Sequence, residues 1–206
     1  MLLWAGVLLL AIGIVCFAID RRAAHVFHDR IPLNVFRGIL RTTDYAKGAH
    51  WLLGSAALFA ISWTTEQLTG PDPLLHLVWR AALAFLASLA IASAVLHSIK
   101  LALGRRRPRD ELEHEFYGFR LCHYNPQHDS FPSGHAMTIF CVAVILSGVL
   151  PILAPLWFVL AVYLALTRAF LNAHFLSDVM IGAAIGLIAA RETVVLLFSD
   201  LARPWF

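Results

Sequence analysis

Three short polar fragments stand at the edges of long apolar runs, where a membrane protein ordinarily avoids charge. They combine cations, histidines, a Ser-Gly pair and a carboxylate. Handling a phosphate ester requires such a set: cations for the equatorial oxygens, a nucleophile, and an acid for the leaving group. The fragments are Lys100-x6-Arg107-Pro108, Phe131-Pro132-Ser133-Gly134-His135 and Thr167-Arg168-x5-His174-x3-Asp178.

Lys100, Arg107 and Arg168 are candidate ligands for a bound phosphate. A cation at mid-bilayer costs ~2.5–3.5 kcal/mol on insertion scales, and a bound anion would offset part of that cost. For each cation alone the alternative is snorkelling, in which a side chain at a span end reaches the headgroups. Pro108 favours an ordered site, because it fixes the chain as it leaves the preceding helix.

The Pro-Ser-Gly sequence before the fourth apolar stretch predicts a tight turn and a helix N-cap at Ser133. Backbone N–H groups at a helix N-terminus form a ready anion site, so Ser133 and Gly134 are candidate phosphate ligands. His135 opens the helix, where it could protonate a leaving oxygen. The structural alternative is a neutral histidine with no role beyond starting the helix.

His174 and Asp178 are four residues apart, so they share one face if a helix begins at this point. A carboxylate on one imidazole nitrogen fixes the tautomer and leaves the other nitrogen free to attack. The alternative is an ordinary helix entry, where the helix dipole favours an aspartate. The position of Asp178 within an apolar run favours the functional interpretation.

Membrane helices must position these residues. The chain has 206 residues, of which 60% are hydrophobic and 14% charged, whereas a soluble domain is roughly half apolar and a quarter charged. We therefore predict an all-α polytopic membrane protein with one domain over 1–206 and no second soluble domain. The first run, 1–19, lacks a basic start and a cleavage site, which favours a retained span over a signal peptide.

Six transmembrane helices are expected, at 2–19, 50–67, 74–103, 135–152, 154–172 and 176–197. The third is too long for a bilayer, since about 45 Å of helix exceeds a hydrocarbon core of ~30 Å. Lys100 should therefore project into the headgroup zone. With six spans, the connections 1–2, 3–4 and 5–6 lie on one side, so the fragments converge at one membrane face. The motif-bearing core covers about 74–198.

The connection 20–49 places Leu33, Phe36, Ile39 and Leu40 on one helical face. This pattern fits either a short interfacial helix or a solvated loop.

The connection 104–134 is rich in Arg, His, Glu and Pro. Its aromatic run, 116–119, either admits a lipid at the membrane edge or packs within the loop. A metal site is the alternative use of the loop histidines, but they match no pattern such as H-E-x-x-H, so no metal is expected. The acidic cluster, Asp110, Glu111, Glu113 and Glu115, is expected to pair with Arg105, Arg106 and Arg109, and the histidines are His114, His123 and His128.

Together the three fragments resemble the signature of the type 2 phosphatidic acid phosphatase superfamily, which is built on K-x6-RP, PSGH and SR-x5-H-x3-D. The match covers about residues 100–178, and the six-helix layout extends it to most of the chain. One departure is Thr167, which stands where the pattern usually has serine but keeps the hydroxyl.

The resemblance implies that His174 attacks phosphorus and forms a phosphohistidine, that Asp178 orients His174, and that His135 protonates the leaving group. It also implies that no metal or other cofactor takes part. The phosphate oxygens would be held by Lys100, Arg107 and Arg168, with further hydrogen bonds from Ser133 and the Gly134 amide.

Three functions stay open at this point. The first is a lipid-phosphate phosphatase acting on phosphatidic acid, phosphatidylglycerol phosphate, undecaprenyl pyrophosphate or lipid A. A lipid phosphotransferase would use the same phosphohistidine with an alcohol in place of water. A non-catalytic lipid or anion transporter would need the cations but not the paired His135 and His174–Asp178.

The expected partners are a lipid phosphate and the bilayer, with no nucleic acid, and the oligomeric state stays open. The net charge of +3 suggests attraction to anionic lipid. The resemblance implies a bacterial inner membrane and a site facing the periplasm or exterior. The Lys and Arg distribution points the other way, because the expected active-site side is the more basic one and the positive-inside rule would place it in the cytoplasm.

Overall fold

The computed structural model describes residues 1–110, 118–121 and 129–206. Most of the described chain is helical, as predicted. The elements are α1 (Leu2–Cys16), α2 (Asp20–Arg30), α3 (Leu33–Thr42), η1 (Thr43–Ala46), α4 (Gly48–Thr69), α5 (Pro73–Ala102), β1 (Leu103–Arg105), β2 (Phe119–Leu121), α7 (Gly134–Val149), η3 (Pro151–Leu153), α8 (Ala154–Phe170), α9 (Leu176–Leu197) and η4 (Ser199–Leu201).

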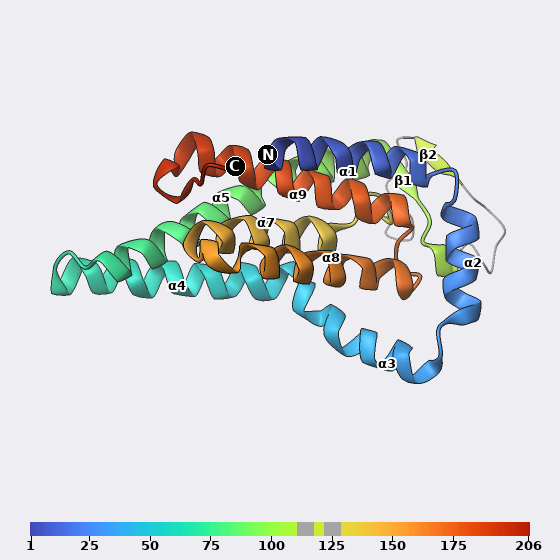
Figure 1. Cartoon of the computed structure of the whole chain (residues 1–206), viewed down its shortest axis with the longest axis horizontal. Helices are drawn as coiled ribbons and strands as arrows, with labels where there is room; N and C mark the ends of the chain where they lie inside the picture. Colours follow the sequence, from blue (N-terminus) through green and yellow to red (C-terminus); the bar gives the residue numbers. More distant parts are fainter. Residues whose placement is uncertain (111–117, 122–128) are drawn as a thin grey trace.

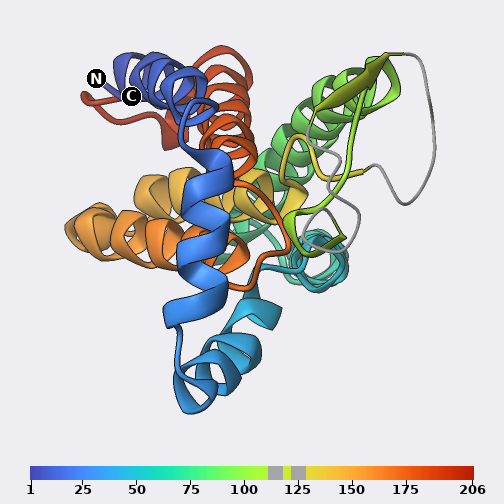
Figure 2. The ribbon, with the colours of Figure 1, turned by 90° about the vertical axis from the view of Figure 1, so that its right-hand side faces the viewer.

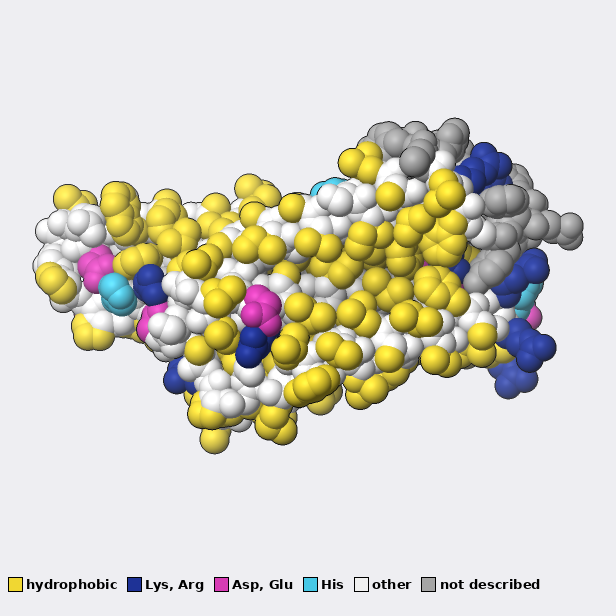
Figure 3. Space-filling view, turned by 90° about the horizontal axis from the view of Figure 1, so that it is seen from above, with side chains coloured by type: hydrophobic (Ala, Val, Ile, Leu, Met, Phe, Trp, Pro, Cys, Tyr) yellow, Lys and Arg dark blue, Asp and Glu magenta, His cyan; other side chains and the backbone are white. Residues whose placement is uncertain are grey.

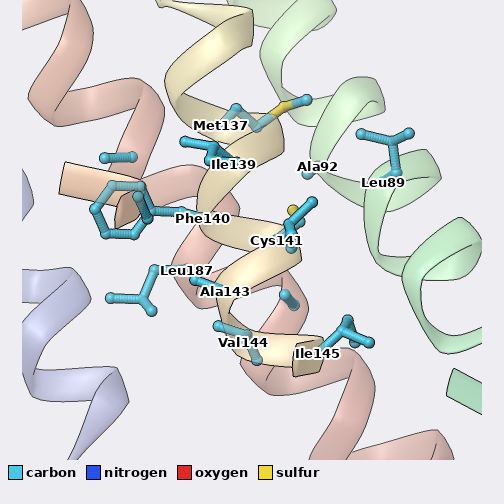
Figure 4. Packing of buried hydrophobic residues seen from close by; sticks show 14 of the residues in the cluster. Leu89, Ala92, Met137, Ile139, Phe140, Cys141, Ala143, Val144, Ile145 and Leu187 are labelled. Atoms are coloured by element: carbon cyan, nitrogen blue, oxygen red, sulfur yellow. The ribbon is translucent and has the colours of Figure 1, made fainter. Parts of the chain in front are cut away.

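Helix α7 is the centre of the bundle, between α5, α8 and α9 (Figure 1). Its sequence is apolar on all sides, which is typical of a helix surrounded by other helices. Nearly every residue from Ala136 to Gly148 is buried. Figure 4 shows its side chains packing against Leu89 and Ala92 of α5 and Leu187 of α9.

Helices α4 and α5 form a long hairpin, and α1 lies along α9 (Figure 1). The start of α5 is fixed by Asp72, whose carboxylate accepts hydrogen bonds from the N–H groups of Leu74 (2.8 Å) and Leu75 (2.9 Å). Pro73 occupies the first turn, where its missing N–H costs nothing. The helix is 30 residues long, as predicted, and carries Lys100 in its last turn.

The prediction of six transmembrane helices is not confirmed. Among the described residues, three helices are long and apolar enough to span a membrane: α5, the segment Pro151–Phe170, and α9. A fourth span results if α1 and α2 are counted as one broken helix. Helix α7 is apolar but shorter, at 16 residues. The six predicted ranges nevertheless all fall on helices.

The chain bends by 83° between α1 and α2. Helix α2 therefore crosses the end of the bundle, and α3 follows it at the same end (Figure 2). The connection 20–49 is thus helical, which excludes the solvated loop. Ile39 of α3 is buried against Leu171 and Ala173, whereas Leu33 and Leu40 stay exposed. In Figure 3 the Lys and Arg side chains gather mainly at one end of the molecule, and hydrophobic side chains cover the flank.

A short two-stranded antiparallel ladder accompanies the helices and was not predicted. Strand β1 continues directly from α5 and pairs with β2, with Leu103 opposite Leu121 and Arg105 opposite Phe119. Arg105 also accepts a hydrogen bond at its carbonyl oxygen from the N–H of Ser130 (3.0 Å). This hydrogen bond holds the exit from α5 close to the segment that enters α7.

Candidate active site

One pocket of about 720 Å³ brings the three polar fragments together. Six of the predicted site residues line it: Lys100, Arg107, Gly134, His135, Arg168 and His174. The other two, Ser133 and Asp178, are fully buried beside it. The rest of the wall is largely apolar and comes from α4, α5 and α7, including Leu52, Leu89, Leu96, Leu101 and Met137. The pocket thus joins a charged end to an apolar wall.

Lys100 and Arg107 are held together by Asp129, which sequence reasoning missed. The carboxylate of Asp129 accepts hydrogen bonds from Nε (3.2 Å) and Nη2 (2.7 Å) of Arg107. Its other oxygen lies 3.8 Å from Nζ of Lys100, which also donates to the Asp129 carbonyl oxygen. Asp129 therefore neutralises part of the positive charge and holds the Lys100 and Arg107 side chains close together in the pocket.

Arg168 is held by Thr43 of η1. The Thr43 hydroxyl accepts hydrogen bonds from Nη1 of Arg168 (3.2 Å) and from the Thr167 hydroxyl (2.9 Å). A hydroxyl oxygen has two lone pairs, so it can accept both. The Thr167 side chain is fully buried in this arrangement, and its hydroxyl provides the hydrogen bond that a serine would also make.

A tight turn after α8 folds His174 back beside Arg168. Asn172 adopts the left-handed conformation (φ 50°), as is common just past a helix end. The N–H groups of Ala173 and His174 then both donate to the carbonyl oxygen of Arg168, at 3.0 and 3.1 Å. This turn places the last fragment's cation and histidine in the same pocket.

The ring of His174 has a defined tautomer. Its Nδ1 lies 2.7 Å from the carbonyl oxygen of Ser130. Because a carbonyl oxygen can only accept, Nδ1 carries the hydrogen and Nε2 keeps its lone pair. Burial lowers the pKa of His174 well below its ordinary value, and the cations Arg168, Arg107 and Lys100 lower it further. The imidazole is therefore neutral, as a nucleophile must be.

Asp178 caps α9 instead of contacting His174 directly. Its carboxylate accepts hydrogen bonds from the N–H of Phe175 (2.9 Å), the hydroxyl of Ser130 (2.6 Å) and Nη1 of Arg105 (2.5 Å). Within the described residues, the Asp178 carboxylate and the His174 ring share no hydrogen bond and are linked through Ser130, which contacts both.

The shared helical face was expected only if a helix began at His174, and that condition is not met. Helix α9 begins at Leu176, so His174 lies before the helix and the four-residue spacing does not place it above Asp178. Asp178 sits in the first turn and folds back to the N-cap, where the helix dipole favours a carboxylate.

The start of α7 lies directly against the start of α9. Ser133 is the N-cap residue of α7, and its N–H donates to the carbonyl oxygen of Asp178 (3.0 Å). The Ser133 hydroxyl is buried and has no hydrogen-bond partner among the described residues. Gly134 and His135 follow in the first turn and line the pocket. The backbone contact fixes His135 relative to the turn that carries His174.

Two glycines of α9 make this contact possible. A Cβ atom on Gly182 would collide with the carbonyl oxygen of Ser133, and one on Gly186 would collide with that of Met137. Small residues four apart on a helix allow a neighbouring backbone to approach closely. The α7 backbone therefore lies directly on this face of α9.

Arg105 pairs with two carboxylates outside the predicted acidic cluster. It is 1% exposed and forms ion pairs with Asp20 (2.8 Å) and Asp178 (2.5 Å). Arg109 does pair with Asp110, at 3.5 Å. Arg105 is thus an interior group, because it is the last residue of β1 and its side chain points into the protein.

Sequence reasoning missed five residues at or behind the site. Asp129 and Ser130 directly precede the Phe131-Pro132-Ser133 fragment, and this position next to a predicted site fragment could have identified them. Asp20 carried a similar signal, as a carboxylate at the end of an apolar run. The remaining two are Thr43 and Arg105, for which the sequence carries no comparable signal.

Several predictions fall on residues outside the described ranges. They concern the metal alternative at His114, His123 and His128, and the acidic residues Glu111, Glu113 and Glu115. Of the aromatic run, Phe119 is exposed but contacts two other rings, with centroids 5.7 Å from Phe17 and 5.2 Å from Phe131. Among the described residues, no three His, Cys, Asp or Glu side chains are grouped as ligands for a metal ion.

Comparisons with known proteins give a consistent result. Lipid A 1-phosphatase of Rhizobium etli is 28% identical over 112 residues, which are 54% of this chain and 48% of the relative. The match thus spans about half the length of that curated relative. A putative undecaprenyl-diphosphatase of Escherichia coli is 29% identical over 180 residues, 82% of this chain and 83% of the relative.

Among solved structures, a transmembrane PAP2 type phosphatidylglycerolphosphate phosphatase from Bacillus subtilis has the same fold. The TM-score is 0.62 at 20% identity, and the alignment covers 98% of both chains. The family model of the PAP2 superfamily matches residues 81–200, more than half of the chain and all three polar fragments. The chain therefore belongs to the PAP2 superfamily.

Proposed function

We propose that this protein is a lipid-phosphate phosphatase that hydrolyses a phosphomonoester or pyrophosphate of a membrane lipid. The observation that carries the proposal is the pocket itself. Lys100, Arg107 and Arg168 converge in it beside a neutral His174, and its other wall is apolar. The relatives' names suggest the substrates to test: lipid A, undecaprenyl pyrophosphate and phosphatidylglycerol phosphate.

In the first step, the three cations bind the phosphate oxygens and orient the phosphorus toward Nε2 of His174. A bond forms between Nε2 and phosphorus as the bond from phosphorus to the leaving oxygen breaks. Burial, and next the cation Arg168, lower the pKa of His135 to about 4, and the negative charge of a bound phosphate raises it again. The protonated His135 of the complex donates a proton to the leaving oxygen, and the lipid leaves as an alcohol or a monophosphate. The cations supply the charge neutralisation that metal ions provide at other phosphoryl-transfer sites.

In the second step, water attacks the phosphohistidine. His135 accepts a proton from the water as the new P–O bond forms and the P–N bond breaks, and inorganic phosphate leaves. The His174 ring carries positive charge while it is phosphorylated. Asp178 stabilises that charge through Ser130, whose carbonyl oxygen accepts the Nδ1 hydrogen and whose hydroxyl donates to the carboxylate.

The apolar wall would hold the lipid chain. Leu89, Ser93, Leu96, His97 and Lys100 follow one another on the same face of α5, and all line the pocket. A phosphate at Lys100 thus places the lipid tail toward Leu89. Burial of apolar chain contributes ~25 cal/mol per Å², so this wall favours lipid esters over soluble ones.

The test is phosphate release from a panel of lipid phosphates in detergent with EDTA present. We expect release by the wild type, none by His174→Ala, and wild-type release by His28→Ala, which removes an exposed histidine of α2. Loss of activity on chelation, or full activity in His174→Ala, would contradict the phosphohistidine mechanism. A folded wild type that releases no phosphate but moves it to a lipid alcohol is a phosphotransferase, and one that does neither favours transport.

We also propose that the protein lies in a bacterial inner membrane with its site facing the periplasm or exterior. The proposal rests on the family resemblance, and the Lys and Arg distribution opposes it. Site-specific labelling decides between a site facing the exterior and one facing the cytoplasm. Cysteine introduced at exposed Arg109, beside the site, should react with an impermeant maleimide in intact cells. Reaction only after lysis would place the site in the cytoplasm.

A further inference from the structure

Arg105 connects three parts of the chain that are far apart in sequence. Its Nη1 donates to the hydroxyl of Ser177 (2.8 Å) and to Asp178 (2.5 Å). Its Nη2 donates to the carboxylate of Asp20 (2.8 Å). Asp20 in turn accepts hydrogen bonds from the N–H of Ser177 (3.0 Å) and its hydroxyl (2.5 Å). The start of α9 is thus bonded to both members of a buried ion pair.

The surroundings make this arrangement specific for arginine. The guanidinium carbon lies 3.9 Å from the ring centroid of Phe175 and 5.2 Å from that of Phe17. A planar guanidinium stacks on aromatic faces and donates to two carboxylates at once, which a lysine ammonium does not do with the same geometry. Arg105 and Asp20 are almost fully buried, so neither charge is screened by water.

We propose that Arg105, together with Asp20, is a positioning residue that fixes the first turn of α9 and thereby holds the His174 ring in its attacking orientation. The inference rests on the proposed function. Arg105 does not line the pocket, so it acts through other residues and not on the substrate. The connection runs from Arg105 to Asp178, from Asp178 to the hydroxyl of Ser130, and from the Ser130 carbonyl to Nδ1 of His174.

This role makes a specific kinetic prediction. Loss of the Arg105 guanidinium leaves the pocket cations Lys100, Arg107 and Arg168 in place, so binding of the phosphate group should not change. The His174 ring, however, loses its fixed orientation, which slows attack without weakening binding. A purely structural role would instead lower the amount of folded protein and leave the turnover number of the remaining molecules unchanged.

The experiment compares Arg105→Lys with Arg109→Lys in purified full-length protein. Arg109 is a matched control, four residues away and 59% exposed. For Arg105→Lys we expect kcat to fall about tenfold or more, as for loss of a charge-assisted hydrogen bond. KM and the inhibition constant for inorganic phosphate should stay within about twofold of wild type. Arg109→Lys should have the wild-type kcat, KM and inhibition constant for inorganic phosphate.

Asp20→Asn is a second variant, useful if Arg105→Lys does not fold. It keeps an oxygen that can accept from Ser177 but removes one charge from the pair. We expect kcat to fall about threefold to tenfold, again with unchanged inhibition by phosphate. A wild-type kcat in folded Arg105→Lys or Asp20→Asn would overturn the inference, as would a rise in the phosphate inhibition constant that matches the loss of kcat. If the wild type itself releases no phosphate, the proposed function fails first.

Discussion

Gly182→Ala tests whether the contact between α7 and α9 sets the geometry of the site. The added methyl group would meet the carbonyl oxygen of Ser133 far inside van der Waals contact, and would lie 3.1 Å from the Ser133 nitrogen and carbonyl carbon. All three are backbone atoms, so no side-chain rotation can relieve the collision. An ordinary C···O contact is about 3.3 Å or longer, so Ser133 must move by roughly 1 Å.

That movement reaches the chemistry directly. Ser133 begins the helix that carries His135, and its N–H is bonded to the carbonyl oxygen of Asp178. A misplacement of about 1 Å can lower a turnover number roughly 100-fold, and we expect a fall of this order in kcat. Overpacking should also lower the free energy of unfolding by about 1–3 kcal/mol.

The assay is steady-state phosphate release by the purified variant, normalised to the monodisperse fraction. The control is Gly54→Ala on α4, where nothing lies within 4 Å of the new methyl group. Alanine is favoured over glycine in a helix by about 0.5–1 kcal/mol, so the control should be fully active and no less stable. Wild-type kcat in Gly182→Ala, or an equal loss in Gly54→Ala, would refute the reasoning.

Three further predictions concern the charges of the pocket. Thr43→Val removes an acceptor for Arg168, so KM for the lipid phosphate should rise about tenfold in mixed micelles, while Thr43→Ser should restore it. Asp129→Asn removes the carboxylate that neutralises Arg107, so inorganic phosphate should inhibit severalfold more strongly at low salt, and added salt should reduce the difference. The lowered pKa of His174 makes the fold bind fewer protons than the unfolded chain, whose histidine titrates near pH 6.5, so stability should fall as pH drops below about 6.5, by up to ~1.4 kcal/mol per pH unit. Thermal unfolding of His174→Gln between pH 8 and pH 5 should show a correspondingly smaller change.

The helices and the pocket residues could be predicted from the sequence because both depend on local signals. Apolar runs located all six predicted helices, and the three fragments named six residues that line one pocket. The fragments do meet in one pocket, but the argument that brought them to one side counted six membrane spans, and that number is not confirmed. The number of spans could not be predicted, because it depends on bends such as that between α1 and α2.

The supporting contacts could not be predicted, because they join residues that no periodicity relates. Arg105 appeared to belong to a charged surface loop, and only the ladder with β2 turns it toward Asp20. Asp178 seemed to face His174 because the spacing argument assumed a helix that already includes His174, whereas the predicted range and the observed helix both begin at residue 176. A shift of the helix start past His174 changes the partner of the carboxylate, which shows how sensitive such arguments are to helix boundaries.

The bonds around Arg105 also set the order in which the site can be completed during synthesis. They join residues separated by 85 and 157 positions along the chain, so the first and last quarters must both be in place. A nascent chain that ends before α9 already contains Lys100, Arg107 and Arg168. It lacks the segment that fixes the proposed nucleophile. Such a chain lacks the Asp178 carboxylate that holds Ser130 beside His174, so we expect ester hydrolysis only after the last helix has been inserted.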